Sequence, residues 1–199
     1  MSKTLKTLFA TLALTLSGAA MAAPTGQHSG LRFVMTGGLT GGGDKLSTVR
    51  YTNGSSKSIR TGALVQFGAG VVWRDHELPA SIKLTANMHM DIAPGSNGDV
   101  YFRRFPIELI GYYHPTDRWM VGVGARWAVK PKLVYDIDGY SNRVRFDNAY
   151  GLLFEVGYNF NDHLALIGRY AHEDYEYRDF NSNDSIDGSH LGLMLDYRF

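Results

Sequence analysis

The final nine residues, with the sequence LGLMLDYRF, constrain the fold of this chain more than any other segment. Every second position carries a large apolar side chain; these positions are Leu191, Leu193, Leu195, Tyr197 and Phe199. Gly192, Asp196 and Arg198 lie between them, and Met194 is the one apolar exception. A period of two is typical of a β-strand with one apolar and one mostly polar face. The segment therefore predicts an amphipathic strand that ends on an aromatic residue.

The first 22 residues have the organisation of a secretory signal peptide. Lys3 and Lys6 form a basic start, residues 8–16 form a short apolar run, and Ala-Met-Ala at 20–22 fits an A-x-A cleavage site. The run is too short to span a bilayer as a helix. We expect export through a Sec-type signal peptide, 1–22, and a mature protein that forms a single domain over residues 23–199.

Charge and cysteine content exclude two classes of protein. The chain has 20 Lys and Arg against 19 Asp and Glu, and removal of Lys3 and Lys6 leaves 18 − 19 = −1. A basic surface for nucleic acid is therefore not expected, and we predict no nucleic-acid partner. Because the chain contains no Cys, an exported domain of this kind must be stable without disulfides.

Alternation of apolar and polar residues recurs along the chain and predicts eight strands. The predicted segments are 31–40, 58–73, 80–91, 100–113, 118–130, 144–160, 163–177 and 188–199. The clearest is 80–91, where Ile82, Leu84 and Ala86 alternate with Lys83 and Thr85. Beyond the signal peptide there is no apolar run of the length that a transmembrane helix requires. The pattern indicates an all-β protein.

The predicted connections alternate in length. Three are short (74–79, 114–117 and 161–163), and four are longer and polar (41–57, 92–99, 131–142 and 178–187). Consecutive strands joined in this way form an antiparallel up-and-down sheet, with all short turns at one end. Since the number of strands is even, the first strand begins and the last strand ends at the short-turn side of the sheet.

The terminal strand ending on Phe199, the signal peptide and the eight alternating segments together resemble the small eight-stranded bacterial outer-membrane β-barrel proteins. That group includes the OmpX, OmpW and opacity-type barrels and the OmpA membrane domain; no subfamily motif is present. The resemblance implies a closed transmembrane barrel in the bacterial outer membrane with short periplasmic turns and longer extracellular loops. It also implies a monomer whose partners are periplasmic chaperones, the assembly machinery, outer-membrane lipid and lipopolysaccharide. The assembly signal would comprise Leu191, Leu193, Leu195, Tyr197 and Phe199.

Aromatic residues on the apolar face fall into two groups, as the two interfacial belts of a membrane barrel do. Near the short turns are Trp73, Tyr113, Trp119, Tyr158, Tyr197 and Phe199, and near the longer loops are Tyr101, Trp127, Phe146, Tyr150 and Tyr170. The 12 residues from Tyr101 to Tyr113 would rise by roughly 30 Å in a tilted strand, which matches a bilayer. A soluble sandwich or lipocalin-like barrel, with these aromatics buried, is the alternative.

If the apolar face is outside, charged residues collect in the lumen. The predicted lumenal charge network comprises Arg32, Lys83, Arg104, Glu108, Arg126, Glu155, Arg169, Glu173, Asp196 and Arg198. An eight-stranded barrel is just wide enough for side chains, and buried charges need partners. Six cations and four anions predict a salt-bridged plug. A narrow polar path, or a small-ligand site that uses the surplus positive charge, remains an alternative.

The sequence predicts no catalytic residue, no metal site and no cofactor. Ser189 and His190 are adjacent, so on a regular strand they face opposite ways. His172 and Asp174 share the apolar face, but no Ser is placed with them by sequence. We therefore expect an integral barrel with a structural or surface-interacting role. The alternatives are a narrow channel for small or hydrophobic solutes and a lipid A-modifying acyl-transfer or deacylase enzyme.

Overall fold

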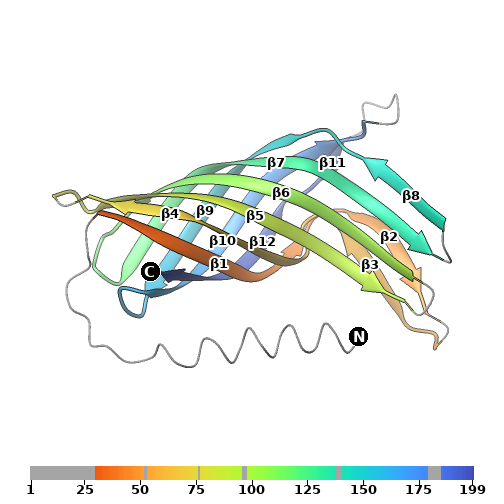
Figure 1. The fold of residues 1–199 in the computed structure, drawn as a ribbon, viewed down its shortest axis with the longest axis horizontal. Helices are drawn as coiled ribbons and strands as arrows, with labels where there is room; N and C mark the ends of the chain where they lie inside the picture. Colours follow the sequence, from red (N-terminus) through yellow and green to blue (C-terminus); the bar gives the residue numbers. More distant parts are fainter. Residues whose placement is uncertain (1–29, 52, 76, 96–97, 138–139, 179–184) are drawn as a thin grey trace.

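The computed structural model describes residues 30–51, 53–75, 77–95, 98–137, 140–178 and 185–199. The predicted signal peptide, 1–22, lies outside these residues. Eight strands form the barrel: β1 (Gly30–Gly42), β4 (Leu64–Arg74), β5 (Ala80–Pro94), β6 (Gly98–Tyr113), β7 (Trp119–Ile137), β9 (Ala149–Asn159), β10 (Leu164–Glu176) and β12 (His190–Arg198). Four shorter strands lie at the long-loop end (Figure 1): β2 (Lys45–Arg50), β3 (Ser56–Arg60), β8 (Tyr140–Arg145) and β11 (Ser185–Asp187). None of the described residues forms a helix long and apolar enough to cross a membrane.

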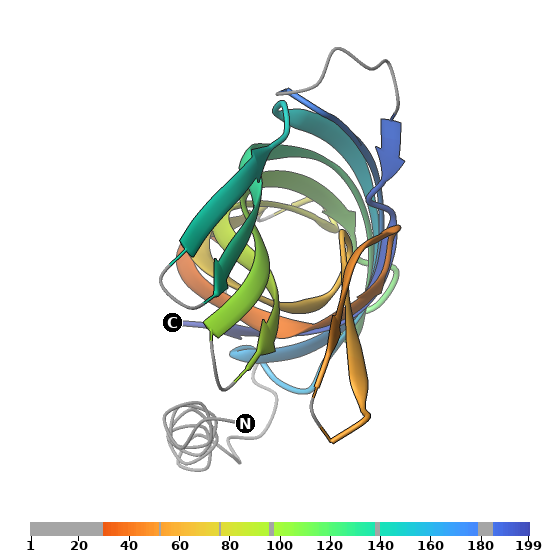
Figure 2. The ribbon, with the colours of Figure 1, turned by 90° about the vertical axis from the view of Figure 1, so that its right-hand side faces the viewer.

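The sheet closes on itself. Every neighbouring pair around the barrel is antiparallel, in the order β1, β4, β5, β6, β7, β9, β10 and β12. The first and last strands complete the ring, with Val34 opposite Arg198 and Met35 opposite Tyr197. Seen from the long-loop end, the strands form a continuous wall around one axis (Figure 2). The predicted closed antiparallel barrel of eight strands is confirmed.

The apolar face of every barrel strand points outward. Leu84 on β5, Leu109 on β6 and Val123 on β7 are each at least 45% exposed, whereas Lys83, Glu108 and Arg126, on the other face of the same three strands, are at most 3% exposed. A soluble barrel would show the reverse pattern, with apolar residues inside and charges outside. The exposed apolar band therefore marks a surface that faces lipid.

Three predicted boundaries are wrong, all at the long-loop end. The segment predicted as one strand over 58–73 is two elements, because β3 ends at Arg60 and β4 begins at Leu64. Likewise, 144–160 divides into the end of β8 and β9, and β7 continues to Ile137, beyond the predicted end at 130. The predicted loops also contain β2, β11 and half of β8, residues 140–142. The outer side of these extensions carries mostly polar and charged residues, while Leu46, Ile59 and Val144 pack inward on a buried apolar cluster. The extensions therefore lack the regular alternation that marks the membrane-spanning parts.

A β-bulge explains why the alternation on β7 ends near residue 130. Arg103 pairs with Lys132 and Phe105 pairs with Val129, so β7 carries one more residue than β6 between these pairs. Lys130, inside the bulge, has a left-handed backbone with φ of 52°, and its N–H donates to Asn148 Oδ1 at 2.9 Å. The extra residue reverses which positions face outward. Beyond the bulge, β7 continues as a ribbon with β8.

Candidate functional site

Charged side chains from six of the eight barrel strands meet inside the barrel. Lys83 on β5 lies 2.8 Å from Asp196 on β12 and 3.5 Å from Glu155 on β9. Glu155 also accepts hydrogen bonds from Arg169 on β10. All four side chains are at most 4% exposed. The long cationic side chains thus cross the lumen and join strands that are not neighbours.

The same chain of contacts continues toward the long-loop end. Arg169 donates to Glu108 Oε2 at 2.9 Å, and Glu108 accepts from Arg126 at 3.0 Å. Arg126 Nε lies 3.0 Å from Glu173 Oε2, and Arg104 Nε lies 3.6 Å from Glu173 Oε1. From Asp196 to Arg104, the eight groups alternate in sign at every step. Each buried charge therefore has at least one neighbour of opposite charge, as a low-dielectric interior requires.

Arg32 and Arg198, predicted in this network, lie outside it at the short-turn end. Arg198 donates to Asn159 Oδ1 at 3.0 Å. Arg32 donates to the carbonyl oxygens of Phe199 and Asp162, both at 2.8 Å. Both arginines bind amide or carbonyl oxygens instead of lumenal carboxylates. The network itself therefore balances four cations against four anions, and Arg198 is a further buried cation at the short-turn end.

Neutral groups complete the network. Gln66 donates to Glu108 Oε1 at 2.9 Å and accepts from Arg126 at 3.1 Å. The Tyr112 hydroxyl donates to Glu155. A Cβ atom at Gly122 would lie 2.6 Å from the Tyr112 ring. Glycine at position 122 therefore makes the space in which Tyr112 reaches across the lumen.

An apolar cluster fills the barrel above the network, at the long-loop end. Phe102, Phe146 and Tyr175 pack edge to face, with ring centroids 5.6 to 6.3 Å apart. Ile59 of the β2–β3 hairpin belongs to the same cluster, and Phe102, Tyr175 and Ile59 are completely buried. The guanidinium of Arg104 lies 5.2 Å from the Phe102 ring centroid, where the two layers meet. The lumen is thus closed by a charged layer and an apolar layer.

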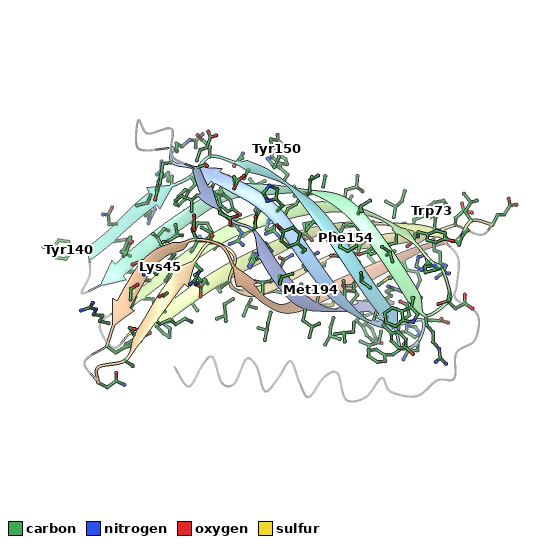
Figure 3. The ribbon with its side chains drawn as sticks, turned by 180° about the vertical axis from the view of Figure 1, so that it is seen from behind. Lys45, Trp73, Tyr140, Tyr150, Phe154 and Met194 are labelled. Atoms are coloured by element: carbon green, nitrogen blue, oxygen red, sulfur yellow. The ribbon has the colours of Figure 1, made fainter. Side chains whose placement is uncertain are left out.

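Ten of the eleven predicted belt aromatics lie on the outer surface; the prediction is wrong for Phe146, which is 2% exposed and packs in the apolar cluster inside the barrel, because it lies where β8 and β9 meet, outside the regular alternation. Trp73, Tyr113, Trp119, Trp127, Tyr150, Tyr170 and Phe199 are exposed, and Tyr101, Tyr158 and Tyr197 are half-buried. Trp119 packs edge to face on Tyr158 near the short turns, and Trp127 stacks on Tyr150 near the long loops, at centroid distances of 5.1 and 6.1 Å. Figure 3 shows Trp73 toward one end of the barrel and Lys45 and Tyr140 at the other.

One pair of side chains on the outer face could not be predicted from the sequence. Ser189 Oγ lies 2.8 Å from His172 Nδ1, since the β10–β12 register brings Ser189 beside the strand that carries His172. Beside them is an open depression of the lipid-facing surface, lined by Val123, Gly124, Leu152, Leu153, Phe154, Tyr170 and His172. To predict this pair from the sequence, the pairing register of β10 and β12 would have to be known. Asp174, expected beside His172, has no hydrogen bond to it among the described residues.

The sequence of this chain matches a known protein family. A family model described as outer membrane protein beta-barrel domain matches residues 10–199. The chain belongs to this family. Membership of the family implies the bacterial outer membrane, so the short turns are periplasmic and the long loops extracellular. A search of curated proteins found no match.

Two solved structures share the barrel's fold. Neisserial surface protein A has 12% sequence identity and a TM-score of 0.54, over 86% of this chain and 98% of that one. Ail, the attachment invasion locus protein of Yersinia pestis, has 8% identity and a TM-score of 0.52, over 86% of this chain and 100% of that one. At these identities the likeness extends to the fold alone.

Proposed function

We propose that this protein is a sealed, non-enzymatic barrel of the outer membrane that presents its extracellular extension to the cell surroundings. The observation that carries this proposal is the closed lumen. Its charge network is neutral and at most 4% exposed, and an apolar cluster lies above it. A channel would need a continuous hydrated path lined by polar groups, and these two layers occupy that path.

The β2–β3 hairpin supports closure at the extracellular end. The Arg60 N–H donates to Asp91 Oδ2 at 2.8 Å, and Lys57 Nζ donates to the Ile92 carbonyl. These contacts fasten the hairpin to β5 and hold Ile59 in the apolar cluster. A lid that moves easily would have few such anchors.

Single-channel recording in planar lipid bilayers tests this function. We expect the refolded protein to produce no discrete current steps under conditions in which a large porin, reconstituted in parallel, conducts. Regular steps from the heat-modifiable, folded protein would overturn the proposal and favour the alternative of a narrow channel.

We also propose that the protein is exported by a Sec-type signal peptide cleaved after Ala22. Periplasmic chaperones would then deliver it to the outer-membrane assembly machinery, which would recognise the last strand. The alternation of Leu191, Leu193, Leu195, Tyr197 and Phe199 supports this, since all five side chains lie on the outer face, where another protein can reach them during insertion. We propose a monomer, because the ring of paired strands leaves no open sheet edge.

One observation favours a second candidate, hydrolysis of a lipid acyl ester. His172 could accept the Ser189 proton and make the hydroxyl nucleophilic, and the adjacent depression could hold an acyl chain. The lipid A mass spectrum of cells with wild-type protein, Ser189→Ala protein or no protein separates the two. Loss of one acyl chain only with the wild type would support hydrolysis; identical spectra would exclude it for lipid A.

A further inference from the structure

Three basic side chains occupy one row across the extracellular end of the barrel wall. Arg103 on β6 is the register partner of Lys132 on β7, and Lys132 is the partner of Arg145 on β8. All three point outward, and Lys130 and Arg143 flank the row. Like charges directly opposite each other on neighbouring strands destabilise a sheet. The barrel therefore carries an electrostatic cost here that an anion would remove.

In the part of the chain that the structure describes, three of these five cations have no carboxylate beside them to balance their charge. Among the described residues, Arg103, Lys132 and Arg143 have no carboxylate within salt-bridge distance. Arg103 Nε is buried without a hydrogen-bond partner, while its guanidinium lies over the Tyr101 and Phe105 rings, 5.8 and 5.5 Å from their centroids. Partial burial and then the surrounding cations lower the pKa of Lys132. The row thus has a fixed arginine with unused donor capacity and a lysine in a strongly positive environment.

The position of the row identifies the source of the anion. Phe105 and the stacked Trp127–Tyr150 pair lie on the same outer surface, closer to the middle of the barrel than Arg103 and Lys132. Tyr101, another aromatic of this belt, lies beyond Arg103 on β6, so Arg103 and Lys132 are within the belt. Aromatic belts lie at the level of the lipid head groups, so cations within them face the phosphates of the outer leaflet. A site for protein carboxylates or for soluble anions would have no reason to lie at the level of the aromatic belt.

We propose that Arg103, Lys132 and Arg145 form a binding site for the phosphate groups of lipid A, with Lys130 and Arg143 in support. None of these five residues has a local sequence pattern that predicts such a site. The site would fix the position of the barrel in the outer leaflet and bind lipopolysaccharide to its β6–β8 wall. This deepens the surface role proposed above, but it does not depend on whether the lumen conducts.

Native mass spectrometry and lipid competition in nanodiscs test the site with a matched pair of variants. Lys132→Gln/Arg145→Gln removes two charges from the row. Lys45→Gln/Arg50→Gln removes two exposed charges from the β2–β3 hairpin at the same end of the barrel. We expect the first variant to bind bis-phosphorylated lipid A at least about tenfold more weakly than the wild type, and the second to bind it nearly as well.

Two further arms identify the ligand. Lipid A without phosphates should bind the wild type as weakly as the row variant, and inorganic phosphate at equal concentration should not compete. In detergent without lipid A, Lys132→Gln should raise the unfolding temperature, because it relieves repulsion within the row. The proposal would be overturned if both variants lost binding equally, or if the wild type bound dephosphorylated lipid A as well as bis-phosphorylated lipid A. Competition by inorganic phosphate, or a lower unfolding temperature for Lys132→Gln, would also overturn it.

Discussion

At the scale of single residues, the alternation of charge inside the barrel determines which substitutions are costly. Glu155 touches Lys83, Arg169 and Tyr112, so its carboxylate is the most connected anion in the lumen. Removing one member of a buried ion pair leaves the partner charge uncompensated, which costs about 3–5 kcal/mol. Removing an adjacent cation and anion together leaves the remaining network balanced.

Replacing Glu155 by Leu should therefore lower the stability of the folded barrel by about 3 kcal/mol. Adding Arg169→Met should recover part of this loss, since Lys83 keeps Asp196 and Glu108 keeps Arg126. Urea unfolding in lipid vesicles measures both values, with Glu77→Gln in an exposed turn as the control. A double variant as unstable as the sum of the single variants would contradict the coupling.

His114, in a periplasmic turn, provides a pH-dependent contribution to stability. Burial, reinforced by Arg74 and Arg198, lowers the pKa of His114 to about 4, and its Nε2 lies 2.8 Å from Ser81 Oγ. The unfolded chain binds this proton near pH 6.5, but the folded barrel does not. Stability should therefore fall as the pH decreases from 6.5 to 4. The difference between the pH profiles of the wild type and His114→Asn isolates this effect; parallel profiles would refute it.

At the scale of elements, the strands that cross the membrane were predictable and the extracellular ones were not. A lipid-facing and a lumen-facing side impose strict alternation, which is clear on β5 and β12. The ribbon of β7 and β8 carries Lys132 and Arg143 where the hydrocarbon of the bilayer no longer faces the strand, so residues 131–142 have the sequence of a polar loop. The bulge at Lys130 further conceals the continuity of β7, because it reverses the alternation.

The last strand should have separate effects on assembly and on stability. Phe199 is 59% exposed and its ring packs only on Tyr197 among the described aromatic rings, so Phe199→Ala should barely change the unfolding midpoint of refolded protein. The amount of folded protein in cell outer membranes should nevertheless fall severalfold, if the assembly machinery reads this ring. Phe160→Ala, 54% exposed at the same end, is the control. Equal losses for both variants would show that the last strand has no special role.

At the scale of the whole molecule, the architecture could be predicted from sequence but the candidate sites only in part. Eight of the ten predicted network residues meet in the lumen, because alternation alone assigns them to the inner face. The positions of Arg32 and Arg198 depend on strand tilt and on the end of the barrel, and the His172–Ser189 contact depends on register. The row of Arg103, Lys132 and Arg145 likewise depends on register across three strands, which no local pattern encodes.

The central claim is that the charged face is sealed inside and the apolar face meets lipid. Accessibility of single cysteines tests it most directly, since the chain has no Cys of its own. Thr85 is 1% exposed in the lumen, Leu84 is 45% exposed on the outer face, and Lys45 is exposed at the extracellular end. In intact cells, a small charged thiol reagent should label Lys45→Cys only, and lipid-dissolved quenchers should reach a probe at Leu84→Cys but not at Thr85→Cys. Rapid labelling of Thr85→Cys by the charged reagent would show an open lumen and contradict the account.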